Sequence, residues 1–418
     1  MVSGKKKRGI FALAFCFIIT GNLYAMESST IEDTVKKMSN TQKIGRMIML
    51  DFRNWKKQDD TEKKAVIEMN DEIRDIVKKY CVGSIILFAQ NFLGGQEKSK
   101  KLSEDFKSLG VKLIATDQEG GKVQRIISDK GIYKNNGKIE NKEEAYQKGV
   151  DIAKECLDWG VNVVLAPVAD VNSNPNNPVI GVRSFGDNPK YVADCCSAFV
   201  KGAKEHGVIC VGKHFPGHGD TLVDSHEGLP TVNKTEEELQ DCEFIPFKRL
   251  IDENIDMIMT AHILLPNIDN GYPATLSEFI DENIDMIMIA PILLPVLPML
   301  LPMLLLNIGK GCPATLSEKI LTGILRNKLK YDGIIITDAM NMRAIKDNFG
   351  PLEACKLAIQ AGADILLMPL ILRSEEDICK LKELYSCLEK EIETNPEFKK
   401  RVDESVARVL KLERTLNK

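Results

Sequence analysis

Residues 333–338 read Gly-Ile-Ile-Ile-Thr-Asp, a short apolar run that ends in a single carboxylate. Runs of this kind recur along the 418-residue chain, and each has the length and apolar content of a buried β-strand. The eight runs are residues 47–51, 83–88, 113–117, 161–167, 208–213, 255–262, 333–338 and 364–369.

Charged segments with helical periodicity separate the runs, for example 62–80, 142–159, 236–253 and 316–330. Strands that alternate with helices predict a parallel sheet with helices outside it. A count of eight units favours a closed (β/α)8 TIM barrel over a doubly wound sheet. We therefore expect an α/β protein in which residues 26–418 form a single barrel domain.

Polar residues stand at the ends of several runs. Asp117 ends the third run, Lys213 and His214 the fifth, His262 the sixth and Asp338 the seventh. Burial of such side chains at the end of a strand costs free energy unless they are paired with other groups or take part in a functional site. Since barrel enzymes gather their chemistry at the C-terminal ends of the strands, we expect one shared site there.

The middle of the chain contains a duplication. Residues 252–278 contain DENIDMIM and PATLSE, and both motifs return within residues 281–318. A barrel needs only one sixth strand, so 279–318 is interpreted as a partial duplication inserted between strands 6 and 7. We expect the first copy to form the strand, because it keeps Thr260-Ala261-His262 where the second has Ile289-Ala290-Pro291.

The second copy also contains residues 289–306, an apolar stretch with prolines at 291, 295, 298 and 302. Its 18 residues approach the length of a membrane span. Each interior proline, however, costs a helix about 3 kcal/mol. A stable span is therefore not expected, and the stretch is interpreted as an extruded loop.

The first 25 residues are typical of a signal peptide, with a basic start (5–8), an apolar run (9–19) and Leu23-Tyr24-Ala25 before the cleavage site. The run is too short for a membrane anchor, which needs about 20 residues. We therefore expect export to the periplasm or the exterior. Without these residues the chain has 52 basic and 60 acidic side chains, a net charge of −8 that disfavours nucleic-acid partners.

Ten cysteines follow the expected cleavage site, at spacings without metal-ligand character. Most are interpreted as small buried apolar side chains. An oxidising compartment would allow one or two disulfides, whose pairing the sequence does not specify.

Three of the five histidines lie within residues 214–226. A metal site there lacks a convincing ligand spacing. Asp224 beside His226 suits proton transfer instead, because a carboxylate orients an imidazole and favours its protonated form. Asp338 is placed to act as a nucleophile, although a helix N-cap is the structural alternative.

Several motifs together resemble glycoside hydrolase family 3, specifically its β-N-acetylhexosaminidase branch. They are TDQEGG (116–121), RSFG (183–186), KHFPGHGD (213–220), DSH (224–226) and TDAM (337–340). Their order and their strand positions agree with the family, and the resemblance runs from about residue 41 to 369 apart from the insert.

The resemblance implies a retaining hydrolase that forms a covalent glycosyl intermediate on Asp338. His226 would be the acid/base, partnered by Asp224, and neither a cofactor nor a metal is needed. The implied substrate is an oligosaccharide of cell-wall or chitin type with terminal β-linked N-acetylglucosamine. The implied sugar-binding residues are Asp117, Arg125, Arg183, Lys213 and His214.

Two alternatives remain open. The insert could disable the site and leave a catalytically impaired, sugar-binding barrel. A β-glucosidase or β-xylosidase of the same family is the other alternative. It is disfavoured because the relatives in question take a glutamate acid/base from a second domain, and only about 50 residues follow the eighth run here. Transfer of the sugar to phosphate instead of water also stays open.

Overall fold

The structure is a computed structural model that describes residues 31–57, 60–269 and 311–416. The expected signal peptide (1–25) and most of the second copy of the duplication lie outside the described residues. Within the described parts of the chain, no helix is long and apolar enough to cross a membrane.

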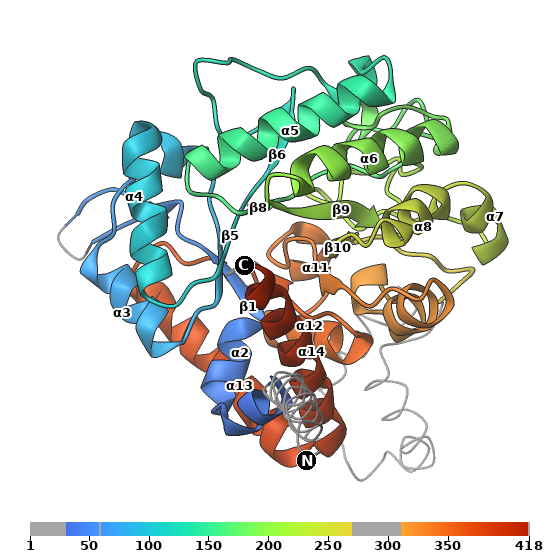
Figure 1. The fold of residues 1–418 in the computed structure, drawn as a ribbon. Helices are drawn as coiled ribbons and strands as arrows, with labels where there is room; N and C mark the ends of the chain where they lie inside the picture. The colour runs from blue at the N-terminus through green and yellow to red at the C-terminus, as the bar shows by residue number, and fades with distance from the viewer. Residues whose placement is uncertain (1–30, 58–59, 270–310, 417–418) are drawn as a thin grey trace, which may run out of the picture.

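Eight parallel strands form the central sheet. Seven lie within one of the predicted apolar runs, and β9 extends two residues beyond the fifth run, 208–213. In sheet order they are β11 (Ile334–Ile336), β10 (Met257–Thr260), β9 (Ile209–Phe215), β8 (Val163–Val164), β5 (Leu113–Thr116), β4 (Ser84–Ile86), β1 (Ile48–Asp51) and β12 (Leu366–Leu367). Ile336 bridges Ile365, and the Thr337 N–H donates to the Ile365 carbonyl at 2.9 Å, so the two edges of the sheet meet. The predicted (β/α)8 barrel is confirmed (Figure 1).

Helices surround the strands on the outside, as Figure 1 shows. One or two of them follow each strand, which accounts for eight β-then-α units. They are α3 (Asp71–Lys79), α4 (Gly95–Ser108), α5 (Lys142–Asp158), α6 (Pro189–Lys204), α7 (Glu236–Asp241) with α8 (Phe244–Asp252), the π-helix η5 (Lys319–Lys328), α12 (Pro351–Ala361), and α13 (Ile378–Thr394) with α14 (Pro396–Thr415). A further helix, α2 (Asn40–Arg46), precedes β1 and contacts α13 and α14.

Two predicted helical segments differ from the structure at their boundaries. In segment 62–80 the helix begins only after Asn70, whose side chain accepts a hydrogen bond from the Ile73 N–H and so caps α3. Segment 236–253 is divided into α7 and α8 at Cys242. Pro246, at the start of α8, has no N–H with which to continue a helix hydrogen-bond ladder through this point.

Alternate residues of each strand face opposite sides, and this divides the core in two. On β1, Met49 belongs to the cluster inside the barrel, whereas Ile48 and Leu50 belong to the larger cluster between strands and helices. Both kinds of residue are fully buried, as expected for a parallel sheet covered on both faces.

The sixth unit is assembled from both copies of the duplication. The first copy forms β10, as predicted. The second copy supplies Thr315, whose hydroxyl donates to the Ala261 carbonyl at 2.9 Å and lies 2.9 Å from both Thr260 Oγ1 and His262 Nδ1. The PATLSE motif of the second copy therefore packs against the strand of the first.

The ten cysteines of the described residues are all free thiols. Six of them are buried: Cys156, Cys195, Cys196, Cys210, Cys312 and Cys355. This fits their interpretation as small apolar side chains, and no pair among the described residues forms a disulfide.

Candidate active site

A cavity of about 170 Å³ lies at the C-terminal ends of the barrel strands. Its lining includes seven of the eight residues predicted from the sequence: Asp117, Arg125, Arg183, Lys213, His214, His226 and Asp338. The eighth, Asp224, is hydrogen-bonded to His226. The topology therefore brings together side chains from segments more than 200 residues apart.

Asp338 stands two residues after β11 and lies partly buried in the cavity. One carboxylate oxygen accepts a hydrogen bond from the Ala339 N–H at 2.7 Å. Burial alone would raise the pKa of Asp338, but nearby His262 and His214 lower it overall, so the carboxylate is ionised at neutral pH. The N-cap position of the next helix, α11 (Arg343–Lys346), is Met342 and not Asp338, and the helix N-cap alternative is therefore wrong.

Asp224 and His226 form the pair that the sequence suggests. The Asp224 carboxylate lies 2.8 Å from His226 Nδ1 and accepts the His226 backbone N–H at 2.9 Å. Burial raises the pKa of Asp224, but the hydrogen bonds from His226 outweigh this and lower it. With Nδ1 bound to the carboxylate, Nε2 is left for proton exchange. The His226 ring is 68% exposed at the rim of the cavity.

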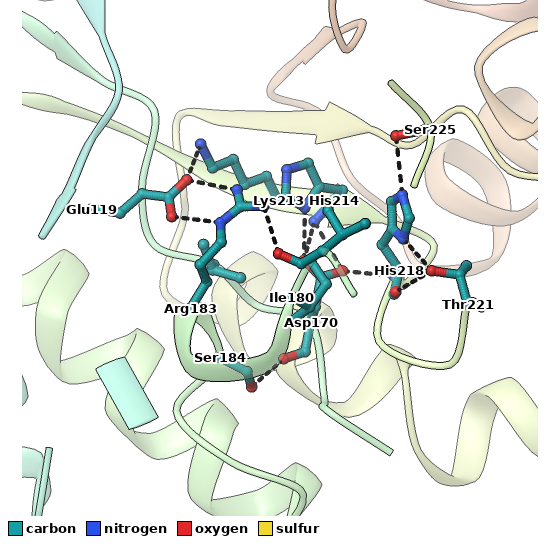
Figure 2. Close-up of polar contacts among 12 residues, drawn as sticks. Glu119, Asp170, Ile180, Arg183, Ser184, Lys213, His214, His218, Thr221 and Ser225 are labelled. Carbon is teal, nitrogen blue, oxygen red and sulfur yellow. Dashed lines mark hydrogen bonds and ion pairs between the residues drawn. The ribbon is translucent and has the colours of Figure 1, made fainter. Parts of the chain in front are cut away.

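A chain of ion pairs crosses the opposite side of the cavity (Figure 2). Lys213, only 2% exposed, lies 2.9 Å from Asp117 and 2.6 Å from Glu119. Arg183 donates two hydrogen bonds to Glu119, at 2.8 and 2.9 Å. Burial lowers the pKa of Lys213, but Asp117 and Glu119 overcome this and raise it. The lysine is therefore held charged.

Glu119 is a cavity residue that sequence reasoning missed as an individual, although its motif was recognised. It is 1% exposed, and Arg183 and Lys213 hold its pKa far below the usual range despite the opposing effect of burial. A glutamate directly before two glycines, two residues after the third apolar run, was the available signal.

Asp170 was also missed, and it positions the histidine segment. Its carboxylate lies 2.6 Å from His214 Nδ1, and it accepts the backbone N–H groups of His214 and His218. Burial would raise the pKa of Asp170, but His214 and the other donors lower it. Figure 2 shows Asp170 at the centre of these contacts.

The remaining two buried histidines have structural contacts. His218 is 2.7 Å from Thr221 Oγ1 and 3.2 Å from Ser225 Oγ, so it ties the histidine segment to the loop that carries His226. His262 Nε2 lies 3.0 Å from the Ala339 carbonyl, beside Asp338. Burial lowers the pKa of both imidazoles, so both are neutral at pH 7.

A metal site in the histidine segment, residues 214–226, is the alternative to proton transfer. Among the described residues, no group of three or more histidine, cysteine, aspartate or glutamate side chains could hold a metal ion. The histidines instead face carboxylate or hydroxyl partners within the chain.

The fold and the cavity define a (β/α)8-barrel enzyme, because the polar groups gather at the end of the barrel where such enzymes react. The chain belongs to glycosyl hydrolase family 3. The model described as the glycosyl hydrolase family 3 N terminal domain matches residues 39–280 and again 277–412. The match divides where the duplication interrupts the barrel.

Relatives of established name cover most of the chain. Beta-hexosaminidase A of Pseudoalteromonas piscicida is 34% identical over 91% of this chain and 62% of its own length. Beta-hexosaminidase of Idiomarina loihiensis is 30% identical over 73% of this chain and 81% of its own length. The structure of a glycoside hydrolase family 3 beta-N-acetylglucosaminidase from Paenibacillus sp. str. FPU-7 matches with a TM-score of 0.73 and 31% identity. The match covers 91% of this chain and 63% of that protein. The chain therefore spans somewhat less than two thirds of two of these relatives.

Proposed function

We propose that this protein is an exported, retaining β-N-acetylhexosaminidase that releases terminal β-linked N-acetylglucosamine from cell-wall or chitin-type oligosaccharides. The observation that carries the proposal is the presence of Asp338 and the Asp224–His226 pair at one cavity whose opposite wall is polar. Relatives named as hexosaminidases support the substrate class. The basic and apolar N-terminal residues support export.

The proposed reaction has two steps. In the first, an Asp338 oxygen attacks the anomeric carbon, the glycosidic C–O bond breaks, and His226 Nε2–H gives its proton to the leaving oxygen. In the second, water attacks the anomeric carbon, His226 takes the water proton, and the bond to Asp338 breaks. The two inversions retain the configuration, and histidine occupies the place of the usual second carboxylate.

Hydrolysis of p-nitrophenyl N-acetyl-β-glucosaminide by the purified chain tests the proposal, beside the matching glucoside and xyloside. We expect the N-acetyl substrate to be preferred by at least about 100-fold in kcat/KM, a difference of roughly 2.7 kcal/mol. Preference for the glucoside or xyloside would instead support the other branches of the family.

A copy that lacks residues 279–318 is the matched control for the insert. Because PATLSE occurs twice, removal of 279–318 gives the same polypeptide as removal of 273–312. The deleted protein therefore keeps a motif for the contacts that Thr315 makes with Ala261 and His262. We expect it to fold and to be at least as active as the full chain. Activity in the deleted copy alone would mean that the duplication disables the site, and inactivity of both folded proteins would favour a sugar-binding role.

Substitution of His226 by alanine tests its role as the acid. Aryl glycosides with an activated leaving group need little protonation, so their rates should fall far less than those of natural oligosaccharides. General acid catalysis contributes about 10²–10⁴-fold, and we expect this loss only for the poor leaving group. Glu227→Ala, at the exposed next position of the same loop, serves as the control. Equal losses on both substrates would contradict the assignment.

A further inference from the structure

His262 is a fully buried side chain that the proposed reaction does not use. It stands two residues after β10 and does not line the cavity. Both of its ring nitrogens nevertheless have partners: Nδ1 lies 2.9 Å from Thr315 Oγ1, and Nε2 lies 3.0 Å from the Ala339 carbonyl oxygen. Burial of a polar ring costs free energy unless its nitrogens are paired, so these two contacts hold the ring in one orientation.

The partners of the ring also define which nitrogen carries the proton. The Ala339 carbonyl can only accept, so Nε2–H donates to it. Burial keeps the ring neutral by lowering its pKa, and Nδ1 is therefore an acceptor for the Thr315 hydroxyl, which also reaches the Ala261 carbonyl at 2.9 Å. Thr260 in turn donates to Thr315 Oγ1 at 2.9 Å. Thr315 thus fixes the tautomer that can donate to Ala339.

The contact with Ala339 reaches the nucleophile through a single residue. The Ala339 N–H donates to the Asp338 carboxylate at 2.7 Å, while the Ala339 carbonyl accepts from His262. The next N–H, that of Met340, donates to the Leu367 carbonyl of β12 at 2.9 Å. The peptide group between Ala339 and Met340 is therefore fastened to the end of β10 on one side and to β12 on the other. Loss of His262 would free one side and loosen the adjacent N–H that orients Asp338.

The other end of this chain of contacts belongs to the second copy of the duplication. Thr315 is fully buried in the short 3-10 helix η4 (Ala314–Leu316). The Ala314 N–H donates to the Ile263 carbonyl at 2.8 Å. The PATLSE motif of the second copy is therefore fastened to the residue directly after His262, and this places the Thr315 hydroxyl at the ring.

We propose that His262, held by Thr315 of the second copy, is a positioning residue for the nucleophile Asp338. The inference rests on the proposed hydrolase function. Attack requires an Asp338 oxygen to stand in line with the anomeric carbon, and a displacement of about 1 Å can slow such a reaction about 100-fold. Since His262 does not line the cavity, its loss should affect the attack and not the binding of the sugar.

Reaction with an activated fluoro-sugar derived from N-acetylglucosamine tests the inference, because the rate of adduct formation on Asp338 reports the attack apart from later steps. For His262→Ala we expect the maximal rate to fall about 100-fold, and the sugar concentration at half-maximal rate to change less than about threefold. His262→Gln should recover at least about tenfold of the loss, because the glutamine amide N–H can donate to the Ala339 carbonyl in place of Nε2–H. A merely structural role would not separate the rate from the binding of the sugar.

The duplication supplies a matched control, since PATLSE occurs at 273–278 and at 313–318. Valine has the shape of threonine but lacks the hydroxyl. Thr315→Val should lower the maximal rate at least about fivefold, as loss of one hydrogen bond does. Thr275→Val, the same change at the same motif position of the first copy, should leave the rate within about twofold of the wild-type value.

A rate that His262→Ala leaves unchanged would overturn the inference, and so would a loss in Thr275→Val as large as that in Thr315→Val. Urea denaturation shows whether each variant is folded. If His262→Ala is not folded, His262→Gln and Thr315→Val carry the test, and wild-type rates in both would overturn the inference. Failure of the full chain itself to form an adduct on Asp338 would contradict the proposed function, and so the two failures can be distinguished.

Discussion

Asp338→Ala is expected to lower kcat/KM for the N-acetyl glycoside by on the order of 10⁴-fold or more, as loss of a nucleophile does in other enzymes. The physical reason is that no other carboxylate of the described cavity lies on the β11 side, and Asp117 faces it from the opposite wall. Mass spectrometry of the chain after reaction with an activated fluoro-sugar should show a covalent adduct. The alanine variant should show none.

Asp332→Ala is the matched control for this prediction. Asp332 stands two residues before β11, whereas Asp338 stands two residues after it, and Asp332 is 81% exposed at the opposite end of the barrel. Its loss should change activity less than about twofold, because an exposed ion pair contributes little. An adduct on Asp338→Ala, or an equal loss of activity in both variants, would contradict the nucleophile assignment.

The strands could be predicted because their apolar runs are separated by charged helices. β11 illustrates this: Ile334, Ile335 and Ile336 are all fully or almost fully buried, as a strand covered on both faces requires. The helix boundaries were harder to predict than the strands, since they depend on hydrogen bonds made by individual capping residues. A reading based on periodicity alone extends α3 upstream of Asn70.

The candidate site could be predicted to the extent that polar residues interrupt an apolar pattern. Asp117 and Asp338 are such interruptions, and both line the cavity. Asp170 escaped notice because it follows an irregular stretch after β8, and its importance depends on contacts with residues 44 and 48 positions later.

The duplication shows a second limit of sequence reasoning. Thr260-Ala261-His262 distinguishes the first copy as the strand, and this was predictable from the residues. PATLSE is identical in the two copies, so no local signal shows which one packs against that strand. The contacts of Thr315 assign this place to the second copy.

Asp170→Ala is expected to lower the free energy of unfolding by roughly 3–5 kcal/mol, the usual cost of removing one partner of a buried charged pair. The substitution leaves the buried N–H groups of His214 and His218 without their acceptor and frees the His214 ring. Urea denaturation measures the loss of stability. Because His214 lines the cavity, kcat/KM should also fall by at least about 100-fold, equivalent to roughly 2.7 kcal/mol of transition-state binding.

Asp220→Ala, in the same loop, is the control, since Asp220 is partly exposed and its pair with Lys234 is long, at 3.4 Å. Asp220→Ala should lower the free energy of unfolding by less than about 1 kcal/mol. The pH dependence gives a further check. The pKa of Asp170 is lower in the folded state than in the unfolded chain. Its contribution to the free energy of unfolding is therefore complete above the unfolded-state pKa of about 3.9, and it is lost as the pH falls through the folded-state pKa. The stability difference between the wild-type chain and Asp170→Ala should therefore shrink in acid, and a difference that grows there would mean that Asp170 is not held as a buried carboxylate.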